Sequence, residues 1–167
     1  KSTEYHEKSL ALRTEIGDQF GEAMSLNNLG YVKIKEKKYN EATIYLHKAL
    51  KIQNNLGDKS GQAYSMNNLA FASKESGNMD EAIDYYRKSL SLYQETGDVE
   101  GQAMVLTNLG MLEFQQENFL DAKIHAEKSY VLSQSLGFPE NIESSAELLS
   151  KLYEKDLNGM EARKMYK

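Results

Sequence analysis

The chain has 167 residues, of which 40% are hydrophobic and 27% are charged, and its formal net charge is -5 at pH 7. This composition is that of a folded domain, and the excess of acidic side chains argues against binding to the phosphates of nucleic acids. The sequence contains no cysteine, which excludes disulfide bonds and thiolate metal sites.

The expected elements repeat every 40 residues along the chain. The glycine-aspartate pairs that mark this repeat are Gly17-Asp18, Gly57-Asp58 and Gly97-Asp98, and Gly137 continues the series. Each copy predicts two helices, from about residue 18 to 36 and from about 40 to 56 in the first copy, because apolar residues recur there at helical spacing. The glycine accepts the left-handed turn that ends one helix, and the aspartate offers an N-cap oxygen to the next. Asn40 and Asp80 are expected to cap the second helices.

The repeat divides the chain into segments. Residues 1–16 match the second helix of a preceding repeat; residues 17–56, 57–96 and 97–136 are full repeats; residues 137–167 are a shortened fourth repeat. In this last segment Leu149 is in register with Leu29, Leu69 and Leu109, and we expect a second helix to begin at about residue 158. The chain starts with Lys1 rather than Met, so we interpret it as a fragment of a longer protein. Its end helices each lack a neighbour on one side, which predicts self-association through them or frayed ends.

Small and apolar residues recur inside each copy. They are Leu26, Leu29, Gly30, Ala42, Leu46 and Ala49 in the first copy; Met66, Leu69, Ala70, Ala82, Tyr86 and Ser89 in the second; and Leu106, Leu109, Gly110, Ala122, Ala126 and Ser129 in the third. Gly30, Ala70 and Gly110 are expected to be small because the partner helix crosses there at close range.

This pattern resembles the tetratricopeptide repeat over essentially the whole chain. The resemblance implies an all-α fold, an α-solenoid of stacked antiparallel helix pairs that winds into a right-handed superhelix. The 40-residue length of each repeat is similar to that of the repeats in kinesin light chains, spindle-orientation adaptors and bacterial signalling proteins. The aromatic residue usual in the family is replaced by Lys33, Ser73 and Glu113, so we expect part of the inner packing to fall to Val32, Ala72 and Leu112.

In the family, the first helices line a groove that holds partner peptides. Transferred position by position, the candidate partner-binding residues of the first copy are Asn27, Asn28, Tyr31 and Lys35, with Met24 on the same stripe. Those of the second are Tyr64, Asn67, Asn68, Phe71 and Lys74, and those of the third are Met104, Asn108, Met111 and Phe114.

Two features of this stripe are suited to binding a partner. An Asn amide at 28, 68 and 108 can pair with the backbone of an extended peptide; the competing interpretation is that each Asn ties one helix to the next. Aromatic and Met side chains are enriched in interface cores, yet a stripe of Tyr31, Phe71, Met111 and Phe114 can equally belong to the protein's own core.

The sequence offers no catalytic, metal or cofactor site. His6, His47 and His125 lie on successive second helices without the paired spacing of a zinc site, and the glycines mark helix joints rather than a phosphate loop. We therefore expect a non-enzymatic scaffold that binds a protein or peptide. Two alternatives stay open: the regulatory or sensor segment of a larger bacterial signalling protein, such as a histidine kinase or transcriptional regulator, and a structural spacer.

No apolar run reaches the length that spans a bilayer, so membrane insertion is not expected. We expect a cytoplasmic location, with a periplasmic sensor segment as the alternative.

Overall fold

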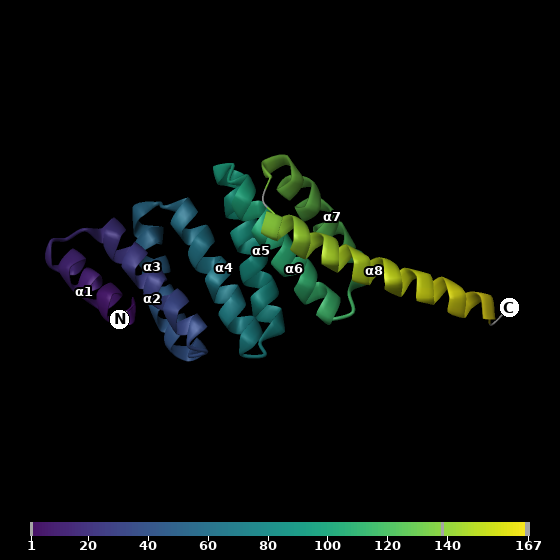
Figure 1. The fold of residues 1–167 in the computed structure, drawn as a ribbon. Coiled ribbons are helices and arrows are strands. Elements are labelled where there is room, and N and C mark those ends of the chain that lie inside the picture. Colours follow the sequence, from purple (N-terminus) through teal and green to yellow (C-terminus); the bar gives the residue numbers. More distant parts are fainter. Residues whose placement is uncertain (1, 138, 166–167) are drawn as a thin grey trace. The chain divides into compact units, whose positions relative to one another are not determined.

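The computed structural model describes the backbone of residues 2–137 and 139–165, and the side chains of residues 4–137 and 139–155. Within these residues the chain consists of helices and the turns between them, without a strand (Figure 1). This confirms the all-α repeat fold. The chain divides into two compact units, residues 1–97 and residues 98–167.

The first unit contains two complete helix pairs preceded by one further helix. Its helices are α1 (Ser2–Glu15), α2 (Gln19–Lys35), α3 (Tyr39–Leu56), α4 (Lys59–Glu75) and α5 (Met79–Thr96). Each helix packs on the next along the chain, and the first helices of the two pairs, α2 and α4, also contact each other. The unit is therefore a stack in which each helix buries one face against its neighbours.

The predicted aspartate caps are present at the start of each first helix. The Asp18, Asp58 and Asp98 carboxylates each accept a hydrogen bond of 2.9 Å from the backbone N–H three residues later. The preceding glycines adopt the left-handed conformation, with φ of 69° at Gly57 and 72° at Gly97. These paired signals fix where one helix ends and the next begins.

The predicted caps of the second helices are wrong. The N-cap positions are Lys38, Asn78 and Asn118, and none of their side chains makes a capping hydrogen bond to the helix. Asn40 and Asp80 lie inside the first turn instead. In the first repeat Lys37, two residues after the end of α2, takes a left-handed φ of 59°, and α3 begins at Tyr39, before the expected cap Asn40.

The two helices of a pair approach most closely at the small residue of the first helix. A Cβ placed on Gly30 would lie 2.6 Å from Cγ of Leu46, whose side chain is fully buried. Gly30 and Leu46 therefore fit only because glycine lacks a side chain. The surrounding core contains Ile34, Ala42, Leu46, Leu69 and Ala72, so Ala72 carries the packing expected of it.

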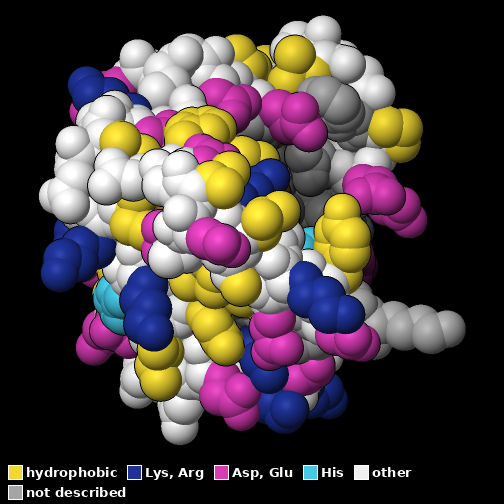
Figure 2. Space-filling view, turned by 90° about the vertical axis from the view of Figure 1, so that its left-hand side faces the viewer, with side chains coloured by type: hydrophobic (Ala, Val, Ile, Leu, Met, Phe, Trp, Pro, Cys, Tyr) yellow, Lys and Arg dark blue, Asp and Glu magenta, His cyan; other side chains and the backbone are white. Residues whose placement is uncertain are grey.

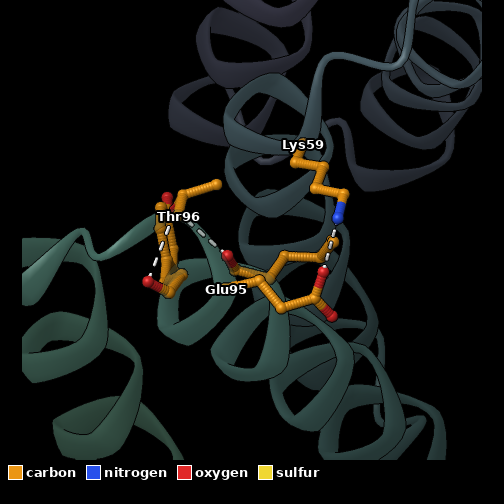
Figure 3. A network of polar contacts seen from close by, with 5 residues as sticks. Lys59, Glu95 and Thr96 are labelled. Atoms are coloured by element: carbon orange, nitrogen blue, oxygen red, sulfur yellow. Dashed lines mark hydrogen bonds and ion pairs between the residues drawn. The ribbon is translucent and has the colours of Figure 1, made fainter.

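An ion pair joins α4 and α5 at the end of the pair that lies opposite their connecting turn. The Lys59 ammonium at the start of α4 lies 2.8 Å from the Glu95 carboxylate near the end of α5, and the Thr96 hydroxyl bonds back to backbone carbonyls of α5 (Figure 3). Both charged side chains are about half exposed, so water screens the pair and its contribution to stability is small, on the order of 0–1 kcal/mol. Its position shows that α4 and α5 run antiparallel.

The second unit contains α6 (Val99–Gln115), α7 (Phe119–Leu136) and α8 (Pro139–Met165). Its core is formed by Ala122, Ala126, Leu148 and Leu152. The Cβ position of Gly110 lies 3.1 Å from Cδ2 of Leu148, so α8 fills the space that the small Ala126 leaves open.

One expectation for the fourth repeat is wrong, and one of its leucines differs in burial from its counterparts. The backbone of α8 continues as one helix to Met165, so the second helix expected from about residue 158 is not formed; the side chains there lie outside the described residues. Leu148 is buried and Leu149 is only half-buried, although Leu29, Leu69 and Leu109 are buried in the other copies. The reason is the same: no second helix covers Leu149 within the described part of the chain.

Among the described residues, no helix is both long and apolar enough to cross a bilayer.

Candidate functional site

One stripe of α2 is open to solvent. Met24, Asn28, Tyr31 and Lys35 follow each other at intervals of three or four residues and are all exposed, Met24 to 47% and Tyr31 to 42%. The Lys35 ammonium lies 5.1 Å from the centre of the Tyr31 ring, a cation–π distance. The stripe therefore offers apolar surface next to a positive charge.

The corresponding stripe of α4 is partly covered. Tyr64 is 39% exposed, whereas Phe71 is half-buried against the core of the first unit. The Lys74 ammonium lies 4.8 Å from the centre of the Phe71 ring and 3.1 Å from the Glu75 carboxylate. Because α2 and α4 contact each other, the two stripes belong to one face of this unit, which we call the α2–α4 face.

Asn68 is the unusual side chain of this face. It is 6% exposed, and its amide nitrogen has no hydrogen-bond partner. A buried donor without a partner costs about 1–3 kcal/mol, so such groups are rare in folded proteins. Asn28, at the same position in α2, is exposed. The two residues thus share a helical position and differ in environment.

Asn27 and Asn67 are not on the surface. Asn27 is 5% exposed and Asn67 is 7% exposed. The Ser65 hydroxyl on α4 lies 2.7 Å from the side-chain oxygens of both Asn27 on α2 and Gln53 on α3. Ser65 therefore links α4 to both α2 and α3, with Asn27 as its partner on α2, and neither Asn27 nor Asn67 is presented to a ligand in this conformation.

In the second unit the candidate residues are more covered. Met104, Asn108, Met111 and Phe114 are all half-buried. Met111 and Phe114 pack against the core of this unit, and the Phe114 ring lies 5.4 Å from that of Phe119. Their apolar character is thus used largely for internal packing, and the α2–α4 face is the more open of the two surfaces.

A second set of polar residues makes contacts between helices that were not predicted from the sequence. The residues that replace the usual aromatic each bind a side chain of the following helix: Lys33 lies 3.0 Å from Glu41, Ser73 donates to Glu81 at 2.8 Å, and Glu113 lies 2.6 Å from His125. Glu113 is 1% exposed. The signal available in the sequence was the Glu that follows Lys33 and Ser73 eight residues later.

Two charged groups at the turn between α2 and α3 have shifted pKa values. The hydrogen bond to Glu41 raises the pKa of Lys33, and the hydrogen bond from Lys38 lowers the pKa of Glu36. Within the described residues no group of three His, Cys, Asp or Glu side chains could hold a metal ion. The chemistry of the site is therefore that of an apolar, hydrogen-bonding surface.

Comparison with known proteins supports the family resemblance. A family model described as tetratricopeptide repeat matches residues 21–95 and 61–135. Comparison with curated protein sequences gives no match.

Solved structures share the fold at low sequence identity. RapI in its apo form aligns with a TM-score of 0.82 at 17% identity, over 93% of this chain and 44% of RapI. A kinesin light chain-like protein from Podospora anserina with nearly identical TPR-like repeats aligns with a TM-score of 0.73 at 16% identity, over 98% of this chain and 82% of that protein. Aspartyl phosphate phosphatase F from Bacillus subtilis aligns with a TM-score of 0.69 at 11% identity, over 99% of this chain and 52% of the phosphatase. The chain thus spans about half the length of RapI and of the phosphatase.

Proposed function

The chain belongs to the tetratricopeptide repeat family, and on this basis we propose that it is a protein-binding scaffold whose contact surface for a peptide or helix is the α2–α4 face. Repeats of this family generally bind protein partners and are typically not enzymes. The partner is an apolar or amphipathic segment, because Met24, Tyr31 and Tyr64 are the exposed side chains that it would cover.

The observation that carries the proposal is the unpartnered amide of Asn68. Its nitrogen is buried without a hydrogen bond, between Tyr64 one turn earlier and Phe71 one turn later on α4. A backbone carbonyl of an extended segment that reached this nitrogen would satisfy the donor. Binding would then remove the cost of an unsatisfied group as well as cover apolar surface.

The test is binding of selected peptides. Peptides from a random display library are selected on the wild-type chain, and their dissociation constants are measured for wild type, Tyr31→Ala and Asn68→Ala. We expect each substitution to weaken binding about ten-fold or more, as for residues at the centre of an interface. Ile44→Ala is the matched control, because Ile44 is 57% exposed on the second helix α3.

Circular dichroism shows whether each variant is folded. The proposal would be refuted if the peptides bound Tyr31→Ala and Asn68→Ala as tightly as wild type but bound Ile44→Ala more weakly. The contact surface would then not be the α2–α4 face.

The alternative function is a regulatory segment of a larger signalling protein. The observation in its favour is that RapI and aspartyl phosphate phosphatase F share this fold over nearly all of the chain while being about twice as long. In that setting the same face would bind a partner whose effect is passed to another domain. The complete reading frame decides: an adjoining kinase, cyclase or DNA-binding domain supports this alternative, and its absence rejects it.

A further inference from the structure

The solvent side of α7 carries a line of apolar side chains. Leu120, Ile124 and Val131 are exposed to 72%, 41% and 63%. Because a helix turns by about 100° per residue, these three side chains point away from the buried ones of α7, which are Ala122, Ala126, Ser129 and Ser133. The line, which we call the α7 line, therefore lies opposite the face of α7 that packs on α6 and α8.

The exposure of the α7 line is a property of its place in the helix pair. The second helix α3 has a neighbour on each side, α2 and α4, and its residues at the matching positions are exposed as well. These residues are Asn40, Ile44 and Lys51. Neighbouring helices of the stack thus leave this side of a second helix open to solvent.

What distinguishes α7 is the chemistry of the three positions. They hold two polar residues and Ile44 in α3, and Asp80, Asp84 and Ser91 in α5. Exposed apolar side chains scattered among charged ones are common on proteins, and Figure 2 shows such a mixture on the side where α1 lies. Three apolar side chains on one line of a single helix are instead the pattern with which helices associate.

Charged side chains flank the α7 line on both sides. Asp121 and Lys128 lie on one side of it, and Lys123 and Glu127 lie on the other. Asp121 accepts a hydrogen bond of 2.8 Å from the neutral amide of Asn118, which leaves its negative charge uncompensated. Lys128 and Glu127 are exposed, and the Lys123 ammonium lies 4.9 Å from the centre of the Tyr153 ring. Each side of the line therefore presents one acidic and one basic group.

An antiparallel α7 of a second copy matches both the apolar and the charged groups. With a two-fold axis level with residue 125, residues whose numbers add up to about 250 lie opposite each other, because the rise per residue is constant. Leu120 then faces Val131 of the second copy, and the two Ile124 side chains meet near the axis. In an antiparallel pair each flank meets the same flank of the other helix, so Asp121 faces Lys128 of the second copy.

We propose that the α7 line binds the α7 line of a second copy, with the two helices antiparallel about a two-fold axis. The same surface is used on both copies, so association ends at the dimer. A contact of one helix with one helix is small, and the dimer is therefore weak and reversible. The α7 line lies on the second unit and is separate from the α2–α4 face, so the dimer does not depend on the function proposed above.

The test reverses the charges that this pairing brings together. Lys128→Glu places two carboxylates opposite each other, Asp121→Lys places two ammonium groups opposite each other, and both changes act twice in the dimer. Lys48→Glu is the matched control, because Lys48 is exposed at the same position of α3. Sedimentation analysis over a range of concentrations measures the dissociation constant of the dimer, and circular dichroism verifies that each variant is folded.

A further variant tests the apolar contact. Val131→Lys introduces the residue that α3 carries at the matching position, Lys51, so it is compatible with a second helix. Its matched control is Ile44→Lys, because Ile44 is 57% exposed on α3.

The wild type and both controls are expected to approach the mass of a dimer with rising concentration, and no higher mass. Each of Lys128→Glu, Asp121→Lys and Val131→Lys raises the dissociation constant about ten-fold or more. An equal mixture of Lys128→Glu and Asp121→Lys dimerises about as tightly as wild type, because opposite charges meet again between the two variants. The proposal is overturned by a wild type that stays monomeric or grows beyond the dimer, by any of the three variants dimerising as tightly as wild type, or by a mixture that associates no better than its components.

Discussion

Replacing Gly30 by alanine tests the close approach of α2 and α3. The new Cβ would lie 2.6 Å from Cγ and 2.7 Å from Cδ2 of Leu46, whereas carbon atoms in contact normally lie about 3.5–4.0 Å apart. Leu46 is fully buried and cannot turn toward solvent. Overpacking of this kind costs about 1–3 kcal/mol, and the better helix propensity of alanine returns about 1 kcal/mol. We expect a net loss of up to about 2 kcal/mol.

Gly110→Ala is the matched comparison at the same position of the third repeat. The nearest atoms there are Cδ2 of Leu148 at 3.1 Å and the backbone oxygen of Ala122 at 3.2 Å, and each has to move by only a few tenths of an ångström. The gain in helix propensity then balances the strain, and we expect a change within about 1 kcal/mol of zero.

Urea unfolding followed by far-ultraviolet circular dichroism measures both variants. The loss should appear as a lower midpoint for Gly30→Ala at an unchanged slope. If Gly30→Ala were as stable as wild type while Gly110→Ala was clearly destabilised, the assignment of the tight contact to Leu46 would be refuted.

Three further predictions follow from contacts described above. His125→Ala removes the 2.6 Å contact of the His125 imidazole with the buried Glu113 carboxylate and should lower the free energy of unfolding by about 1–3 kcal/mol; an unchanged urea midpoint would contradict this. Lys37→Gly relieves a left-handed backbone conformation and should raise the free energy of unfolding by up to about 1 kcal/mol in the same assay. An unchanged free energy of unfolding would contradict strain at this turn. Burial raises the pKa of Tyr86 above its ordinary value of 10.0; the folded state therefore keeps a proton that the unfolded state loses, stability should fall as the pH rises above about 10, and Tyr86→Phe should reduce this fall.

The order of the helices could be predicted because each boundary carries its own local signal. The left-handed glycine and the capping aspartate at Gly57-Asp58 are adjacent in the sequence, and their bonds involve only the next few residues. The close approach at Gly30 could also be predicted, since a repeated small residue in a helix indicates a crossing partner. Local chemistry thus gave the fold and the spacing of its elements.

The environment of the candidate site could not be read from the same pattern. Asn27 and Asn28 are neighbours in the sequence, yet one is buried against Ser65 and the other is exposed, because a helix turns by about 100° per residue. Which of the two faces solvent depends on how α2 packs against α4. Repeat position alone therefore could not distinguish a residue that ties helices from one that is available to a partner.

The end of the chain shows a related limit. The sequence predicts a turn near residue 158 by analogy with earlier repeats, but the helix continues to Met165. A glycine such as Gly159 costs only about 1 kcal/mol inside a helix, which is too little to end one without a neighbour to pack against. The tight turns of the earlier repeats depend on the packing of both helices as well as on their sequence.

The hydroxyl of Ser65, placed between Asn27 and Gln53, has a mechanical consequence for the first unit. Moving one of these three helices along its axis by a single turn would disturb the apolar packing and would also separate these polar groups from their partners. The hydrogen bonds of the Ser65 hydroxyl therefore hold the three helices in one axial alignment. Forces applied to α2 would be transmitted to α3 and α4 rather than lost in slippage between them.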